Sequence, residues 1–92
     1  MTGMLASSKA GHDKGDIYVI IREETEYVYL VDGKLRTLEK PKKKNKKHIQ
    51  IIKKAVETSF TEKIRNGQAD DSEIRKVIKQ YKQSHYKKYN KL

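Results

Sequence analysis

A short basic loop with two glycines is the stretch of this chain best suited to bind a ligand. Residues 8–15 read Ser-Lys-Ala-Gly-His-Asp-Lys-Gly, and an apolar run follows them closely. Gly11 and Gly15 allow backbone angles that a side chain would forbid, and they leave backbone N–H groups accessible to a phosphate. The basic side chains on this loop are Lys9, His12 and Lys14. The combination predicts a phosphate-binding loop; the alternative is a tight connection between strands in which Asp13 caps local N–H groups.

A lysine-rich run is the second candidate site, because residues 40–54 contain eight lysines and no acidic side chain. Like charges this close repel one another and are expected to stay solvated, and a polyanion that binds them releases its own counterions. If about four to six of these lysines meet phosphates, log affinity should fall with log salt concentration at a slope of about −3 to −5. The alternative is a solvated loop or a nuclear-localisation-like string.

The overall charge favours a polyanionic partner. The chain has 92 residues, and its 22 Lys and Arg against 12 Asp and Glu give a net charge of +10. Such a surplus attracts nucleic acid, an anionic membrane surface or an acidic protein. Lysine dominates the basic residues, and lysine suits phosphates whereas arginine suits bidentate contact with bases. The balance predicts recognition of backbone and shape more than of base sequence.

No pattern in the sequence indicates catalysis or metal binding. The chain has no Cys, so disulfides, thiolate metal sites and thiol chemistry are excluded. Its three histidines lack the spacing to another His, Asp or Glu that a metal site needs, and no Ser lies in a nucleophile-elbow pattern. We therefore expect no enzymatic activity, no cofactor and no metal. The absence of Cys, of an apolar run of about 18 residues and of a signal-type segment predicts a cytoplasmic protein without membrane contact.

Short strands are expected to position the two basic segments. Alternating or continuous apolar residues bounded by turn residues predict five strands, at residues 4–8, 16–23, 27–31, 34–38 and 48–52. The apolar run in the second of these indicates a strand covered on both sides. Asp32-Gly33 between two apolar runs predicts a two-residue hairpin turn, with residues 34–38 returning antiparallel to residues 27–31. Tyr18 is expected in the core.

The last third of the chain has a helical period. Residues 53–60 are ambiguous, because the spacing of Ile52, Val56 and Phe60 by four allows a helix to begin there. The other interpretation is a helical turn at residues 61–65, capped by Thr61 or Ser59 and ended by Asn66-Gly67. A second helix is expected after Asp70 or Asp71, because Asp70 and Glu73 have capping-box spacing. Its apolar stripe, spaced at i, i+3, i+4, i+7 and i+11, is Ile74, Val77, Ile78, Tyr81 and His85. Tyr86 and Tyr89 are interpreted as exposed and open to base stacking.

Two blocks in this order resemble a known family. Residues 3–15 have the pattern G-x-L-x-x-S-K-A-G-x-D-x-G, which resembles the KOW motif, and residues 32–44 form a second similar block. The chain looks most like the small bacterial KOW-domain RNA-binding proteins related to a large-subunit ribosomal protein family of archaea and eukaryotes. The resemblance covers residues 3–54, with a weaker likeness at residues 71–76.

The resemblance implies a mainly β fold with α: a small SH3-like (KOW) barrel at residues 1–54 and a basic helical extension at residues 55–92. It implies binding to RNA, expected to be large-subunit ribosomal RNA or the ribosome. The alternative is a protein-interaction module of a transcription or translation complex, contacting ribosomal or transcription proteins. The candidate RNA-binding residues are Lys9, Gly11, His12, Lys14, Gly15, Lys34, Arg36, Lys40, Lys42, Lys43, Lys44, Lys46, Lys47 and His48.

Overall fold

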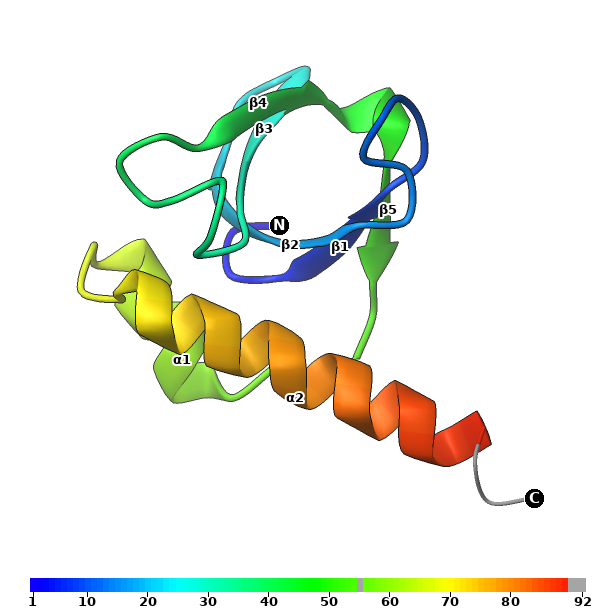
Figure 1. The fold of residues 1–92 in the computed structure, drawn as a ribbon. Helices are drawn as coiled ribbons and strands as arrows, with labels where there is room; N and C mark the ends of the chain where they lie inside the picture. The colour runs from blue at the N-terminus through cyan, green and yellow to red at the C-terminus, as the bar shows by residue number, and fades with distance from the viewer. Residues whose placement is uncertain (55, 90–92) are drawn as a thin grey trace.

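The computed structural model describes the backbone of residues 1–54 and 56–89 and the side chains of residues 1–54 and 56–84. Five strands come first and two helices follow (Figure 1). The elements are β1 (Leu5–Ser8), β2 (Ile17–Glu23), β3 (Tyr27–Val31), β4 (Lys42–Asn45), the 3-10 turn η1 (Lys46–His48), β5 (Ile49–Ile52), α1 (Thr58–Arg65) and α2 (Asp71–Tyr89).

The five strands form one antiparallel sheet in the order β4-β3-β2-β1-β5. The sheet is strongly curled, and its two edge strands β4 and β5 are joined by the short turn η1 (Figure 1). A register shift in β2, between Ile20 and Arg22, lies where the sheet curves. Since β4 and β5 are both edges, the curled sheet is open. The structure therefore confirms the expectation of a small β-rich domain with helices, in the form of an open, curled sheet.

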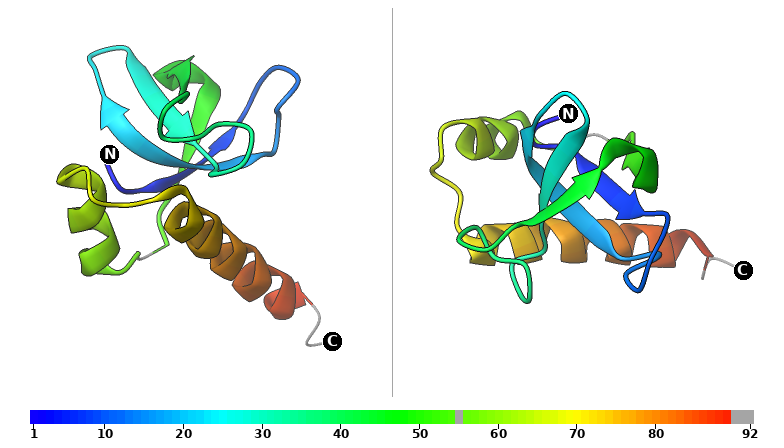
Figure 2. Two further views of the ribbon diagram at one scale, coloured as in Figure 1. Left: turned by 60° about the vertical axis from the view of Figure 1, so that its left-hand side comes forward. Right: turned by 90° about the horizontal axis from the view of Figure 1, so that it is seen from above.

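The two faces of the sheet carry two apolar clusters. Successive residues of a strand point to opposite faces, and in β2 Tyr18 and Ile20 face the inside of the curl while Val19 faces the helices. This alternation confirms that β2 is covered on both sides. The inner cluster is Ala6, Tyr18, Ile20, Val28, Leu30 and Ile49. The outer cluster joins sheet and helices through Leu5, Val19, Val31, Phe60, Ile64, Ile74 and Ile78; Figure 2 shows α1 and α2 on this side.

The helices largely follow the predicted periods. The Asp70 carboxylate accepts a 2.8 Å hydrogen bond from the Glu73 backbone N–H, which confirms the cap of α2. The predicted stripe of α2 packs on the sheet through Ile74 and Ile78, whereas His85, Tyr86 and Tyr89 lie outside the described side chains. Asn66 ends α1 as expected.

The start of α1 differs from the predicted turn at residues 61–65. The helix begins at Thr58, and Glu57 holds the N-cap position without a side-chain cap, so neither Ser59 nor Thr61 is the cap. The earlier start has a packing reason. It places Phe60 and Ile64 one turn apart on the same helix face, where both are buried against the sheet.

The predicted strand at residues 34–38 is wrong. The Asp32 carboxylate accepts the N–H groups of Lys34 and Arg36 at 2.8 and 2.9 Å, which folds the segment into a loop. The strand that pairs with β3 is instead β4, in the lysine-rich run, with Val28 opposite Lys44 and Leu30 opposite Lys42. Because the local carboxylate takes these N–H donors, no ladder with β3 forms there, and the return to the sheet is delayed to Lys42.

Candidate nucleic-acid interface

The centre of the β1–β2 loop is a buried carboxylate. Asp13 accepts hydrogen bonds from the hydroxyls of Ser8 and Tyr18 at 2.8 and 3.0 Å. It also pairs with the ammonium groups of Lys42 at 2.7 Å and Lys44 at 2.6 Å. We call these five residues the Asp13 network. It joins the loop to strands β1, β2 and β4, so that the loop is attached to the sheet by charge as well as by backbone bonds.

The network fixes the ionisation of its members. Burial alone would raise the pKa of the Asp13 carboxyl, but hydrogen bonds from Lys42, Lys44, Ser8 and Tyr18 outweigh burial and hold the pKa far below its ordinary value. Burial raises the pKa of the Tyr18 phenol far above its ordinary value, and the hydrogen bond to Asp13 raises it further. Asp13 is therefore an anion and Tyr18 a neutral donor at neutral pH.

The backbone of the loop is closed by bonds across its base. The Gly15 N–H donates to the Ser8 carbonyl at 2.9 Å, and the Ser8 N–H donates to the Asp16 carbonyl at 3.0 Å. Gly11 and Gly15 have φ values of +87° and +90°, the left-handed region that favours glycine. Both glycines are exposed. The loop thus has a fixed base and an accessible tip. The two glycines allow the predicted turn, but the Gly15 N–H is bonded to the backbone of Ser8 and is not available to a phosphate.

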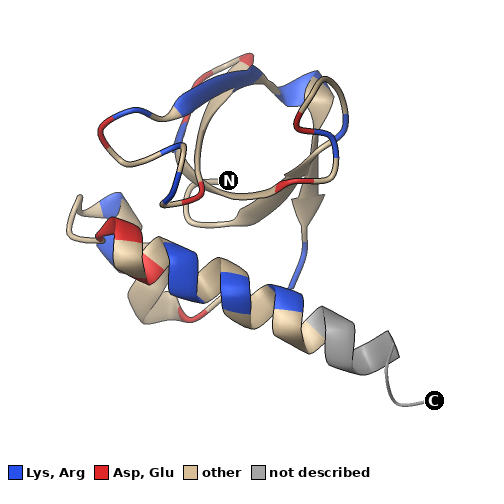
Figure 3. Ribbon diagram, in the orientation of Figure 1, with Lys and Arg blue, Asp and Glu red and all other residues tan. Residues whose placement is uncertain are grey.

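Five basic side chains are exposed around this loop and the neighbouring turn η1. The Lys9 N–H donates to the His48 carbonyl at 2.8 Å, which holds the loop against η1; Figure 3 shows the lysines of both segments on the same end of the sheet. Among the residues that the structure describes, none of the five forms an ion pair. We call this set, Lys9, His12, Lys14, Lys47 and His48, the loop surface.

Most of the lysines in β4 and η1 do not share this exposure. The side chain of Lys44 is 9% exposed and that of Lys42 is 27% exposed, and both pair with Asp13. Lys46 pairs with Glu23 at 2.6 Å, which lowers the pKa of the Glu23 carboxyl. The expectation that the whole run stays solvated is therefore wrong. The strand alternation is the reason, because residues 42 and 44 point inward with the apolar residues opposite them.

Lys43 points to the other face of β4. Its ammonium lies 4.4 Å from the centroid of the Tyr27 ring and 4.0 Å from a Glu24 carboxylate oxygen, and its side chain is 52% exposed. It remains accessible to a partner, although it already has a cation–π contact and a weak ion pair.

The other predicted residues lie at a different place. Lys34, Arg36 and Lys40 are exposed on the β3–β4 loop, which approaches the beginning of α2 through a 2.6 Å hydrogen bond from Arg75 to the Gly33 carbonyl. The structure therefore does not bring all the predicted residues into one surface.

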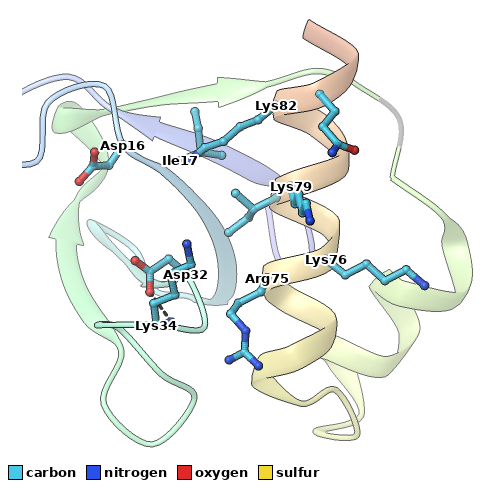
Figure 4. A pocket seen from close by; sticks show the side chains of 10 residues that line it. Asp16, Ile17, Asp32, Lys34, Arg75, Lys76, Lys79 and Lys82 are labelled. Atoms are coloured by element: carbon cyan, nitrogen blue, oxygen red, sulfur yellow. Dashed lines mark hydrogen bonds between the residues drawn. The ribbon is translucent and has the colours of Figure 1, made fainter. Parts of the chain in front are cut away.

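A groove between α2 and the sheet contains basic residues that the sequence analysis did not include. Its volume is about 810 Å³ (Figure 4). It is lined on one side by Asp16 and Asp32 and on the other by α2. The basic residues that line it are Lys34, Arg75, Lys76, Lys79 and Lys82. In the sequence, the spacing of residues 75, 79 and 82 along one flank of a helix could have indicated part of this groove. That spacing does not show which residues of the sheet and loops lie opposite the helix.

Among the described residues, no group of His, Asp or Glu is arranged to hold a metal ion, and no helix there has the length and apolar character needed to cross a membrane. No protein-family model and no curated protein matches this chain. The interface described above therefore rests on the geometry and electrostatics of the chain itself.

Proposed function

We propose that this protein binds RNA, with large-subunit ribosomal RNA as the expected target, and that the loop surface contacts the phosphate backbone. We also propose that the curled sheet is an SH3-like barrel of the KOW type, in line with the resemblance of residues 3–15. The observation that carries the proposal is the exposed, unpaired charge of the loop surface around two accessible glycines.

The Asp13 network supports this proposal because it pairs the carboxylate of Asp13 with lysines of the same chain. A carboxylate on a phosphate-binding loop would repel the ligand. Asp13 is instead buried and paired with Lys42 and Lys44 on the protein side, so the exposed charged side chains at residues 9–15 are basic. The fixed base of the loop also means that little conformational entropy is lost when RNA binds.

Filter binding to ribosomal RNA across a salt series tests the proposal. The variant Lys9→Gln/Lys14→Gln/Lys47→Gln should lower the steepness of log affinity against log salt by about 3, because each lost phosphate contact lowers it by about 1. The matched control is Arg22→Gln/Lys53→Gln/Arg65→Gln, which loses the same charge from exposed positions outside the loop surface and should bind more tightly than the loop variant. Absence of binding by the unmodified protein at low salt, or equal losses in both variants, would overturn the proposal.

The alternative implied by the same resemblance is a protein-interaction module, in which the apolar stripe of α2 would receive a partner instead of packing on the sheet. In the structure Ile74 and Ile78 are 0% and 6% exposed and belong to the outer cluster, so the stripe is used within the chain. A pull-down from lysate with and without nuclease separates the two functions, because partners held through RNA are lost on nuclease treatment.

A further inference from the structure

We propose that the groove along α2 is a second part of the RNA-binding surface, which carries the phosphate backbone from the loop surface towards the β3–β4 loop. This inference rests on the proposed RNA-binding function and specifies the path of the RNA. It assigns binding roles to Arg75, Lys79 and Lys82, which lie outside the KOW-like block at residues 3–54.

The groove has one basic wall, formed by α2, and an opposite wall in which Asp16 and Asp32 are accompanied by Lys34 (Figure 4). Lys79 and Lys82 are exposed on the α2 side and form no ion pair with any described residue. In Figure 4 Lys82 extends across the groove towards Ile17, whereas Lys76 points away from the sheet. Residues 75, 79 and 82 follow one flank of α2 over about 10 Å, given a rise of about 1.5 Å per residue. A chain of phosphates along this flank meets successive cations.

The two ends of the groove are fixed by the rest of the fold. At one end, Gly33 has a φ of +78°, and a Cβ there would lie 2.5 Å from the Asp71 carbonyl oxygen, so the β3–β4 loop lies directly against α2. Arg75 donates to the Gly33 carbonyl at 2.6 Å, which holds its guanidinium at this end and leaves other N–H donors available. The groove is therefore held open by contacts of the folded chain itself.

At the other end, the groove begins where the loop surface ends. Asp16 lines the groove and directly follows the loop that carries Lys14. The β1–β2 and β3–β4 loops project to the same side of the molecule (Figure 2, right), and the tip of the β1–β2 loop lies beside η1, away from α2 (Figure 1). This continuity favours RNA over an acidic peptide as the occupant, because one polyanion can contact both surfaces.

The two carboxylates of the groove define the side on which RNA lies. Asp32 already accepts the N–H groups of Lys34 and Arg36. The Asp16 carboxylate is exposed and has no such donors among the described residues. It repels a phosphate chain and directs it towards the α2 wall. Removing this charge should therefore strengthen binding, an effect that damage to the fold does not produce.

The first experiment measures affinity for single-stranded RNA oligonucleotides of increasing length. The unmodified protein should bind longer oligonucleotides more tightly until both surfaces are occupied. Lys79→Gln/Lys82→Gln should bind short oligonucleotides normally but gain less with length, and its salt dependence on the long ones should be less steep by about 1.4, given about 0.7 per single-strand phosphate contact. The control Lys53→Gln/Arg65→Gln loses the same charge outside the groove and should keep the length dependence.

The second experiment uses Asp16→Asn, which should raise affinity for the long oligonucleotides by about twofold, the effect of one charge at about 8–10 Å in a solvated groove. If the α2 variant keeps the full length dependence while the loop variant loses binding, the groove inference is wrong and the proposed function stands. If the unmodified protein binds no RNA, the proposed function fails with it. Loss of polyglutamate binding in the α2 variant, with RNA binding unchanged, would assign the groove to an acidic protein instead.

Discussion

The Asp13 network and the loop surface are adjacent in the fold, but they use lysine in opposite ways. The Lys44 side chain is only 9% exposed and its ammonium contacts Asp13 at 2.6 Å, whereas Lys14 and Lys47 are exposed and form no ion pair with a described residue. The first use of lysine attaches a loop to a strand. The second leaves charge available to a partner.

The comparison shows why a count of lysines overestimates a binding surface. Three of the four lysines at residues 42–46 are bound closely by carboxylates of the same chain, and the fourth contacts an aromatic ring. The net charge of +10 still belongs to the whole molecule, but its exposed cations without a carboxylate partner among the described residues are divided between the loop surface, the β3–β4 loop, α2 and a few other positions. Four changes test this division.

Asp13→Asn should have the largest effect. It removes the shared partner of two lysines and leaves the Lys44 ammonium buried with neutral acceptors only, and breaking a buried ion pair from one side costs about 3 kcal/mol or more. The free energy of unfolding, measured by urea denaturation, should fall by that amount. A fall of less than about 1 kcal/mol would show that the network does not hold the loop.

Lys44→Gln and Lys47→Gln form a matched pair. Lys44→Gln loses hydrogen bonds to Asp13, Ser8 and the Ala10 carbonyl, so it should lower the free energy of unfolding by about 1–3 kcal/mol. Lys47→Gln should change it by less than about 0.5 kcal/mol, yet make the salt dependence of RNA binding less steep by about 1. The reverse result, a stable Lys44→Gln protein with weakened RNA binding, would invalidate the comparison.

Acidification should remove the contribution of Asp13 to stability progressively, whereas Asp13→Asn removes it in one step. The pKa of this carboxyl is lower in the folded than in the unfolded chain, so the unfolded chain binds more protons at low pH. The stability from Asp13 is complete above about pH 4 and falls below it, by at most about 1.4 kcal/mol per pH unit. Denaturation midpoints measured from neutral to acid pH should show this loss, and Asp13→Asn should reduce its slope. Equal slopes in both proteins would contradict the assignment.

Lys43→Gln should have a smaller effect on stability than Lys44→Gln. Its neighbours in β4 point inward, but Lys43 points outward over Tyr27. An exposed cation–π contact and ion pair together contribute about 1 kcal/mol or less, so the melting temperature should change little. A destabilisation equal to that of Lys44→Gln would mean that β4 does not alternate as described.

Much of the fold was predictable because the spacing of apolar residues along the sequence reflects which side chains are buried. The run at Ile17–Ile21 predicted a strand covered on both faces, which the structure confirms. The stripe from Ile74 to Tyr81 predicted the apolar face of α2, and the structure shows that this face packs on the sheet. Strand β4 was not predictable in this way, since its four residues are Lys42–Asn45 and contain no apolar side chain. Two of its lysines are bound by Asp13, which lies 29 and 31 residues before Lys42 and Lys44.

The candidate site was predictable only in part for a similar reason. The glycines at positions 11 and 15 indicated an exposed turn from their backbone freedom alone, and the structure has that turn. Whether a given lysine is accessible depends on which carboxylate the fold brings beside it. The groove also needs two walls, and the sequence shows the spacing along α2 without showing that Asp16 and Lys34 stand opposite.

The outer cluster has a consequence for any attempt to shorten this protein. Leu5, Val19 and Val31 of the sheet share their burial with Phe60 and Ile74 of the helices. A fragment ending at residue 54 would leave these three strand residues facing water and would be prone to self-association. Gene fusions or tags that replace the helices should therefore fail to deliver a well-folded fragment, and the smallest transferable unit has to extend at least through the second turn of α2.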